Sequence, residues 1–258
     1  FYGLSTLRTG LEKSRNLMTV RIAQNIGVDK IVNFSKKLGI YENPDQLLSI
    51  SLGSTETTLL KLTSAYSSFV NGGKLIKPII IDRVQDSEGT TIVNNDKRSC
   101  SNCSQISYTS EDYPIINDEY KKVFSPQTAY QVTSLLEGVV QRGTGKKLKD
   151  LKLNLAGKTG TTNKNKDAWF IGYSPDIVVG VFVGHDQPKS LGYKETGSSV
   201  AVPIFKNYAL NSEINKNNKP FRIPNGITFI NINPNTGMPS NSKNAIMEPF
   251  IKNSENVL

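Results

Sequence analysis

The sequence predicts an α+β fold, in which a helical subdomain is followed by an antiparallel sheet flanked by helices. Three observations lead to this prediction. Apolar residues recur at helical spacing across residues 5–70, three short apolar runs lie between residues 153 and 184, and a helical pattern stands on each side of those runs. Because only short turns connect the runs, we expect them to pair as antiparallel hairpins. The 258 residues suffice to bury a sizeable core in one large domain or two small ones.

The helical part is divided by residues that end helices. Ser5 is expected to cap a first short helix, and the polar run 13–16 interrupts the pattern after it. Later segments stop at Gly27, at Gly39 and at an Asn-Gly-Gly run, residues that accept the left-handed conformation common at helix C-termini. The helices expected after the break cover 17–26, 30–38 and 58–70, with Asp29 and Thr57 as caps of the last two.

The pattern changes after residue 74, where Ile and Val become frequent. A strand is expected over 75–84, at an edge or a bend because it contains Pro78, with residues 90–93 as its partner. Residues 94–122 show little periodicity and are interpreted as an excursion. The remaining elements expected are a helix from Ser125-Pro126 to Gly143, strands over 153–161, 168–173 and 177–184, and a closing helix over 201–210.

The domain is expected to cover residues 1–211. Residues 212–258 are rich in Asn, Lys and Pro, and we interpret them as a linker and a small extended tail.

The formal net charge is +9, which favours anionic partners in general. The lysines are scattered along the chain, so we interpret the charge as a general enrichment and expect no nucleic-acid partner. No run approaches the roughly 20 apolar residues that span a bilayer. A basic anion-binding protein remains an alternative that rests on charge alone and would show salt-sensitive binding to nucleic acid.

The two cysteines, Cys100 and Cys103, stand three residues apart in a polar stretch. A zinc site would need two more ligands, and His185, the one histidine of the sequence, is far along the chain. A local disulfide and two unpaired thiols are both compatible with this spacing. We expect no metal and no cofactor.

Two short motifs carry the candidate chemistry. Ser14-Arg15-Asn16 lies in the break between two helices, and Lys158-Thr159-Gly160-Thr161-Thr162 ends a strand-like run. Alone, the first is typical of a helix cap and the second of a turn with an exposed lysine. Together and in this order, they match two of the three motifs found in β-lactamases and penicillin-binding proteins.

The residues around both motifs make the match specific. With them, the chain resembles the transpeptidase domain of bifunctional (class A) penicillin-binding proteins of the 1A type. The resemblance covers nearly the whole chain and is weakest in 94–122 and after about residue 212. It rests on the following residues: Ser5 to Asn16, Leu52-Gly53-Ser54, Ala65-Tyr66, Phe69 to Gly73, Arg142-Gly143-Thr144-Gly145, Ala156 to Thr162 and Asp167 to Tyr173. It implies a β-lactamase/transpeptidase-like fold.

The resemblance also implies a mechanism, which is serine acyl transfer with an activated nucleophile, a proton path and an oxyanion hole. Ser14 would lie in the proton path to the leaving amine. Asn16 would hydrogen-bond the substrate amide or the active-site lysine. Lys158 would hold positive charge near Ser14 and the substrate carboxylate.

The residues after Lys158 would bind substrate. The hydroxyls of Thr159 and Thr161 would bind the terminal carboxylate, and the Thr161 backbone N–H would supply one oxyanion donor. Gly160 would let substrate lie against the strand, because it has no side chain to block the approach.

The implied partners are peptidoglycan stem peptides ending in D-Ala–D-Ala and β-lactam antibiotics. The implied enzyme is a serine-type transpeptidase or carboxypeptidase. Its parent protein would also be a glycosyltransferase on the periplasmic side of the bacterial inner membrane, with an N-terminal anchor that this chain lacks.

The family's Ser-x-x-Lys motif, which supplies the nucleophile and its general base, is expected before Ser14. None of the residues before Ser14 forms it, because Arg8 stands where Ser5 would need a lysine. A later match, Ser240 to Lys243, lies in the tail and is interpreted as chance. We therefore expect an N-terminally truncated C-terminal fragment that cannot acylate alone. The alternative is a degenerate, non-catalytic scaffold remnant, and an upstream Ser-x-x-Lys or stop codon would discriminate the two.

Overall fold

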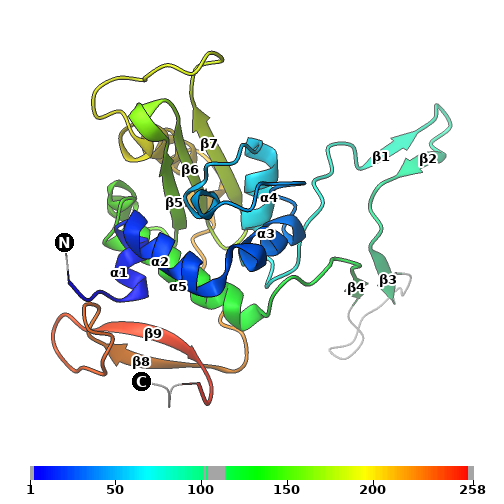
Figure 1. Cartoon of the computed structure of the whole chain (residues 1–258). Coiled ribbons are helices and arrows are strands. Elements are labelled where there is room, and N and C mark those ends of the chain that lie inside the picture. The colour runs from blue at the N-terminus through cyan, green and yellow to red at the C-terminus, as the bar shows by residue number, and fades with distance from the viewer. Residues whose placement is uncertain (1–2, 102, 104–113, 255–258) are drawn as a thin grey trace.

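The computed structural model describes residues 3–101, 103 and 114–254, and its helices and antiparallel strands follow the α+β order expected from the sequence (Figure 1). A three-stranded antiparallel sheet, in the order β5-β6-β7, is packed between helices on both faces. The helices are α1 Leu7–Glu12, α2 Asn16–Ile26, α3 Val28–Lys37, η1 Leu48–Leu52, α4 Leu59–Val70, α5 Pro126–Gln141, η2 Lys146–Leu151, η3 Asn163–Asn165, η4 Gly197–Ala201, α6 Val202–Leu210 and α7 Glu213–Lys216. The strands are β1 Arg83–Gln85, β2 Thr91–Asn94, β3 Ser99–Ser101, β4 Ile115–Asn117, β5 Ala156–Thr161, β6 Ala168–Tyr173, β7 Val178–Val183, β8 Ile227–Ile232 and β9 Ile246–Ile251.

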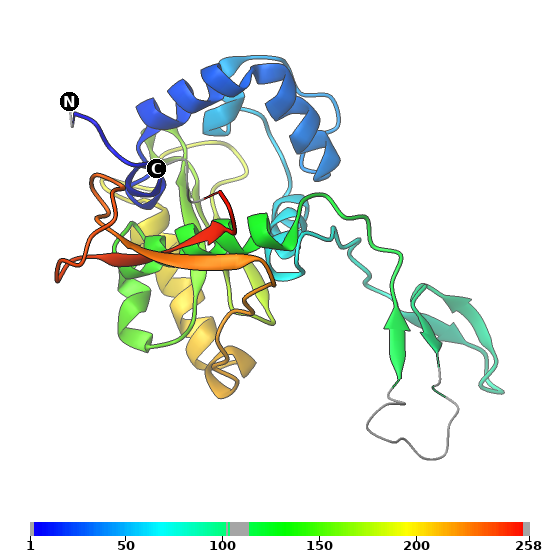
Figure 2. The same cartoon turned by 90° about the horizontal axis from the view of Figure 1, so that it is seen from below.

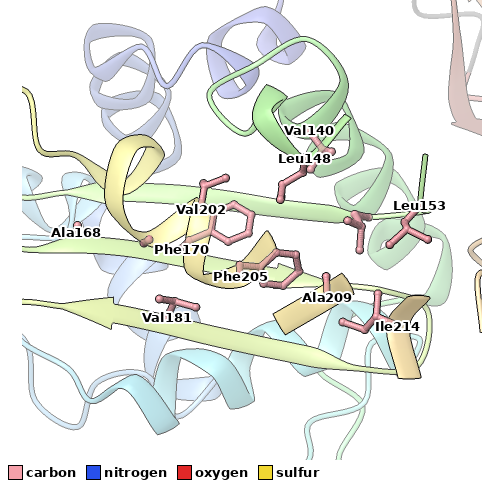
Figure 3. Close-up of a cluster of buried hydrophobic side chains, with 12 residues drawn as sticks. Val140, Leu148, Leu153, Ala168, Phe170, Val181, Val202, Phe205, Ala209 and Ile214 are labelled. Carbon is pink, nitrogen blue, oxygen red and sulfur yellow. The ribbon is translucent and has the colours of Figure 1, made fainter. Parts of the chain in front are cut away.

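The central sheet has its register fixed by side chains that alternate between two cores. On one face, Phe170 packs edge-to-face on Phe205 of α6, with ring centroids 5.0 Å apart (Figure 3). On the other face, Tyr173 joins Leu136 and Val139 of α5 in a second buried cluster. A one-residue slip of β6 would exchange these faces, so burial on both sides specifies the pairing.

The helices begin where hydroxyl side chains cap them, sometimes one residue from the expected position. Thr6, and not Ser5, caps α1 by accepting the Thr9 N–H at 3.2 Å. Thr58, and not Thr57, caps α4, and Thr57 instead donates to the carbonyl of Ile40. The expected cap Asp29 lies inside the first turn of α3, after Gly27. Adjacent hydroxyls can each satisfy a helix N-terminus, so sequence alone does not decide between them.

The described residues between 74 and 122 form an arm that leaves the body of the protein after α4 and returns to it before α5 (Figures 1 and 2). The expected strand over 75–84 is wrong for most of its length, because only Arg83–Gln85 pairs, with β2. Pro78 cannot donate to a ladder, and Ile80 is almost fully exposed. In the excursion, β3 pairs with β4, and Cys100 forms a disulfide with Cys103. Residues 102 and 104–113 of the excursion lie outside the described residues.

Part of the segment interpreted as an extended tail forms a hairpin, which corrects that interpretation. Strands β8 and β9 pair without a register shift, from Ile227 opposite Ile251 to Ile232 opposite Ile246. The hairpin lies against α5, where Tyr130 packs edge-to-face on Phe229. Asn and Pro interrupt the alternation of its apolar residues, so the composition of this segment did not predict strands. The boundary at residue 211 stays a prediction.

Candidate active site

The two sequence motifs meet in space although they are 144 residues apart. The ammonium of Lys158 donates a hydrogen bond of 2.7 Å to the hydroxyl oxygen of Ser14, and a second one of 3.0 Å to the carbonyl of Thr159. Because the Ser14 oxygen accepts from Lys158, its own hydroxyl proton remains available to a third group. This contact joins the helical part of the chain to the sheet.

Ser14 owes its position to the way in which α1 ends. The N–H of Ser14 donates to the carbonyl of Leu11 and that of Arg15 to Gly10, which closes the helix with a tight turn. Ser14 has φ 52°, a left-handed conformation that costs a residue with a side chain about 1 kcal/mol or more. At Ser14 this strain coincides with the contact to Lys158, a combination consistent with a functional site.

Lys158 lies on β5, where its side chain is partly buried. Burial lowers its pKa to about 8. No carboxylate within the described residues forms an ion pair with it that would restore the charged form. At neutral pH the amine is therefore mostly protonated but close to its midpoint, as suits a group that both donates and accepts protons.

We expect Lys158 to titrate with a midpoint near pH 8, below the 10.5 of an ordinary lysine. The unfolded chain then binds more protons between these two values, so this group makes the fold more stable as pH rises through that window. A ¹³C NMR titration of the lysine Cε signals measures the midpoint, and the signal missing from Lys158→Met identifies the residue. A midpoint at the ordinary value would contradict the burial of the amine.

The hydroxyls that follow Lys158 are held by different partners. Thr159 is buried, and its hydroxyl lies 2.7 Å from that of Thr144. Thr161 is exposed, and its oxygen accepts the Gly197 N–H at 3.0 Å. An oxygen that already accepts a hydrogen bond leaves its O–H to donate, so Thr161 presents a donor to an anion.

Gly160 and Asn16 have simpler surroundings. A Cβ at Gly160 would lie 3.1 Å from the Cβ of Trp169, so this glycine also allows β5 to pack closely on β6. Asn16 is the first residue of α2 and is exposed, and its side chain makes no hydrogen bond within the described part of the chain. It lies in the same helix break as Ser14 and is free to turn toward a ligand.

Two residues of the site received no role from the sequence. Thr144 connects Thr159 to Ser198, whose hydroxyl donates to the Thr144 carbonyl at 2.8 Å. The Arg-Gly-Thr-Gly run that contains Thr144 was visible in the sequence, whereas Ser198 carried no signal. His185 is exposed after β7 and takes no part in these contacts.

Two open grooves of the described surface lie elsewhere. One of about 440 Å³ is bounded by Leu38, Leu60 and Tyr120, and one of about 460 Å³ by Thr63, Ile76 and Pro175. Both flank α4 at the base of the arm, and neither contains Ser14 or Lys158. The chemistry of Lys158, and not cavity size, therefore identifies the site. In the described part of the chain, no helix is long and apolar enough to cross a membrane.

Comparisons with known proteins agree on one family. The model of the penicillin binding protein transpeptidase domain matches residues 2–209. The chain is 44% identical over 255 residues to penicillin-binding protein 1A of Rickettsia bellii, which covers 97% of this chain and 32% of that protein. The chain thus spans about a third of the length of the curated relatives it matches.

Solved structures show the same fold. The crystal structure of penicillin-binding protein 1A from Haemophilus influenzae superposes with a TM-score of 0.77 at 27% identity, over 96% of this chain and 40% of that one. The PonA1 protein of Mycobacterium tuberculosis, solved in complex with penicillin V, superposes with a TM-score of 0.64 at 19% identity, over 91% of this chain and 61% of that one.

Proposed function

This chain belongs to the penicillin-binding protein transpeptidase family, and on that premise we propose that it forms part of the acyl-transfer site of a peptidoglycan D,D-transpeptidase. The observation that carries the proposal is the hydrogen bond from Lys158 to Ser14. It joins an amine of lowered pKa to a hydroxyl, a combination suited to moving a proton.

The reaction proposed is the replacement of one peptide bond by another. A serine oxygen attacks the carbonyl of the penultimate D-Ala, its proton passes to the general base, and the C–N bond to the terminal D-Ala breaks. The leaving amine takes a proton from the Ser14 hydroxyl, and Lys158 replaces that proton. The proton held by the general base then restores Lys158. An amine of a second stem peptide attacks the acyl-enzyme, the ester bond breaks, and the amine proton passes to the released serine oxygen. Hydrolysis of the acyl-enzyme would give carboxypeptidase activity instead.

The substrate is proposed to lie along β5. This strand is at the edge of its sheet, so its outer backbone groups can pair with an extended peptide. The Thr161 hydroxyl, which the Gly197 N–H leaves free to donate, is suited to the terminal carboxylate of a stem peptide or of a β-lactam. Thr159 supports this role through Thr144, and Asn16 is proposed to bind the substrate amide.

The attacking serine and its general base are proposed to come from a Ser-x-x-Lys segment, which these 258 residues do not contain ahead of Ser14. The longer protein is proposed to be a bifunctional enzyme of the 1A type. It would polymerise glycan strands and cross-link them on the periplasmic side of the inner membrane. The size of the curated relatives supports this proposal.

Covalent labelling by a fluorescent penicillin tests the function. The chain alone is expected to remain unlabelled. A fusion behind an upstream segment of a penicillin-binding protein 1A that contains Ser-x-x-Lys is expected to be labelled. Alanine in place of the serine of that motif is the matched control and should abolish labelling. Labelling of the chain alone would refute the need for the second segment, and a folded but unlabelled fusion would favour a non-catalytic scaffold.

A further inference from the structure

A buried carboxylate lies two residues before Ser14. Glu12 is 4% exposed and ends α1. Both of its side-chain oxygens accept hydrogen bonds from the guanidinium of Arg142, from Nη2 at 2.6 Å and from Nε at 3.2 Å. Its backbone carbonyl accepts the N–H of Thr144 at 3.2 Å. Glu12 is therefore fastened to the end of α5 by its side chain and its backbone together.

The chain leaves space for this carboxylate by placing glycines around it. A Cβ at Gly138 would lie 2.0 Å from Glu12 Oε1. A Cβ at Gly143 would lie 2.3 Å from the Glu12 carbonyl oxygen. Real Cβ atoms cannot approach so closely, so glycine at both positions allows the end of α1 to sit directly on α5.

The turn after α5 contacts both sides of the site. Arg142 and Thr144 hold Glu12, and the Thr144 hydroxyl meets that of Thr159, the residue after Lys158. The helix break with Ser14 and the strand with Lys158 are thus located against the same turn. The relative position of the two motifs depends on it.

Arg8 completes the group on the side away from the sheet. Arg8 is 5% exposed and donates to Glu12, to Ser134 and to Glu248 of β9. Two arginines and two glutamates balance in charge within these contacts. Glu137 also lies near both arginines, and burial raises its pKa to about 7. Buried ion pairs contribute little net stability compared with apolar packing, but they fix geometry, because each charge must find its partner.

We propose that Glu12 is a positioning residue. Its contacts with Arg142 and Thr144 at the end of α5 fix the helix break, so that Ser14 faces Lys158. The role of Glu12 in proton transfer rests on the proposed function, whereas its effect on the position of Ser14 relative to Lys158 does not. Glu12 itself reaches neither Lys158 nor the edge of β5 by any contact in the described residues. Its action is exerted through the turn at Lys13 and Ser14.

The test uses the chain as it is, with ¹³C-labelled lysine. Ser14→Ala removes the partner of Lys158 and displaces the Lys158 Cε signal by a measurable amount. Glu12→Gln, which keeps the size but not the charge, is expected to displace the signal in the same direction and by at least about half as much. The double variant should add little to Ser14→Ala alone, because both changes act through one contact.

Two further variants make the outcome decisive. Asp118→Asn breaks the Lys74–Asp118 ion pair on the arm and is expected to leave the Lys158 signal in place. Arg142→Lys keeps the charge and loses the paired contact, so it replaces Glu12→Gln if that variant does not fold. Folded variants with an unchanged Lys158 signal, or additive shifts in the double variant, would overturn the proposal. Neither result depends on acyl transfer, so failed penicillin labelling would refute the proposed function alone.

Discussion

Replacement of Arg8 by alanine is expected to lower the free energy of unfolding by about 3–5 kcal/mol. The guanidinium is buried among Glu12, Ser134 and Glu248, and its removal leaves Glu248 without this partner and Glu12 with Arg142 alone. A carboxylate left in a dry site loses solvation without regaining it from a cation. Urea unfolding at pH 7, followed by circular dichroism, measures the change.

The matched control is Arg98→Ala. Arg98 also forms a close ion pair, with Asp96 on the arm, but its side chain is 50% exposed, compared with 5% for Arg8. No resolvable change in the urea midpoint is expected there, because solvent screens exposed pairs. A loss below about 1 kcal/mol for Arg8→Ala would mean that water reaches the ion group and replaces the missing cation.

Replacement of Lys158 by methionine is expected to reduce the rate constant of penicillin acylation by about 10²–10⁴ in the fusion that contains Ser-x-x-Lys. Methionine fills a similar volume but cannot return a proton to Ser14. Stopped-flow or gel-based labelling at several penicillin concentrations separates the acylation rate from binding. The result depends on the proposed function, unlike the titration of Lys158 in the chain alone.

The control for this variant is Lys164→Met. Lys164 follows β5 in the exposed turn toward β6 and makes no contact with Ser14. Its replacement removes the same charge from the same hairpin, so any general effect of lost charge appears in both variants. Equal labelling rates for Lys158→Met and the unmodified fusion would exclude Lys158 from the proton path.

The sequence contained enough local information to predict most of the fold. A helix from Ser125-Pro126 to Gly143 and three strands after it were expected, because their apolar spacing and turns are local signals, and the structure has α5 and β5, β6 and β7 there. The strand over 75–84 was wrong, because frequent Ile and Val do not create a partner strand. Hairpin β8–β9 was missed, because Asn and Pro between its apolar residues resemble a linker.

The residues of the site that lie in contiguous motifs were predicted, whereas the contacts between distant segments were not. The meeting of Ser14 and Lys158 is seen in the structure, and its motifs were visible because each is contiguous. The position of Glu12 was not predicted, since it depends on α1, on Gly138 of α5 and Gly143 of the turn after it, and on β9. No sequence spacing relates such distant segments, and a buried charge network becomes visible only when burial is known.

The contact between Arg8 and Glu248 has a consequence for how the protein is made. These residues are 240 positions apart, so Arg8 leaves the ribosome long before its partner exists. Contacts of such sequence separation form late, after the loop between them has closed. The nascent chain can build its helices and central sheet early, but α1 gains its contact with β9 only when that hairpin has been synthesised. A chain that ends before that hairpin would therefore lack the contact between Arg8 and Glu248, and would keep the contacts of α1 with α5 through Glu12 and Ser134.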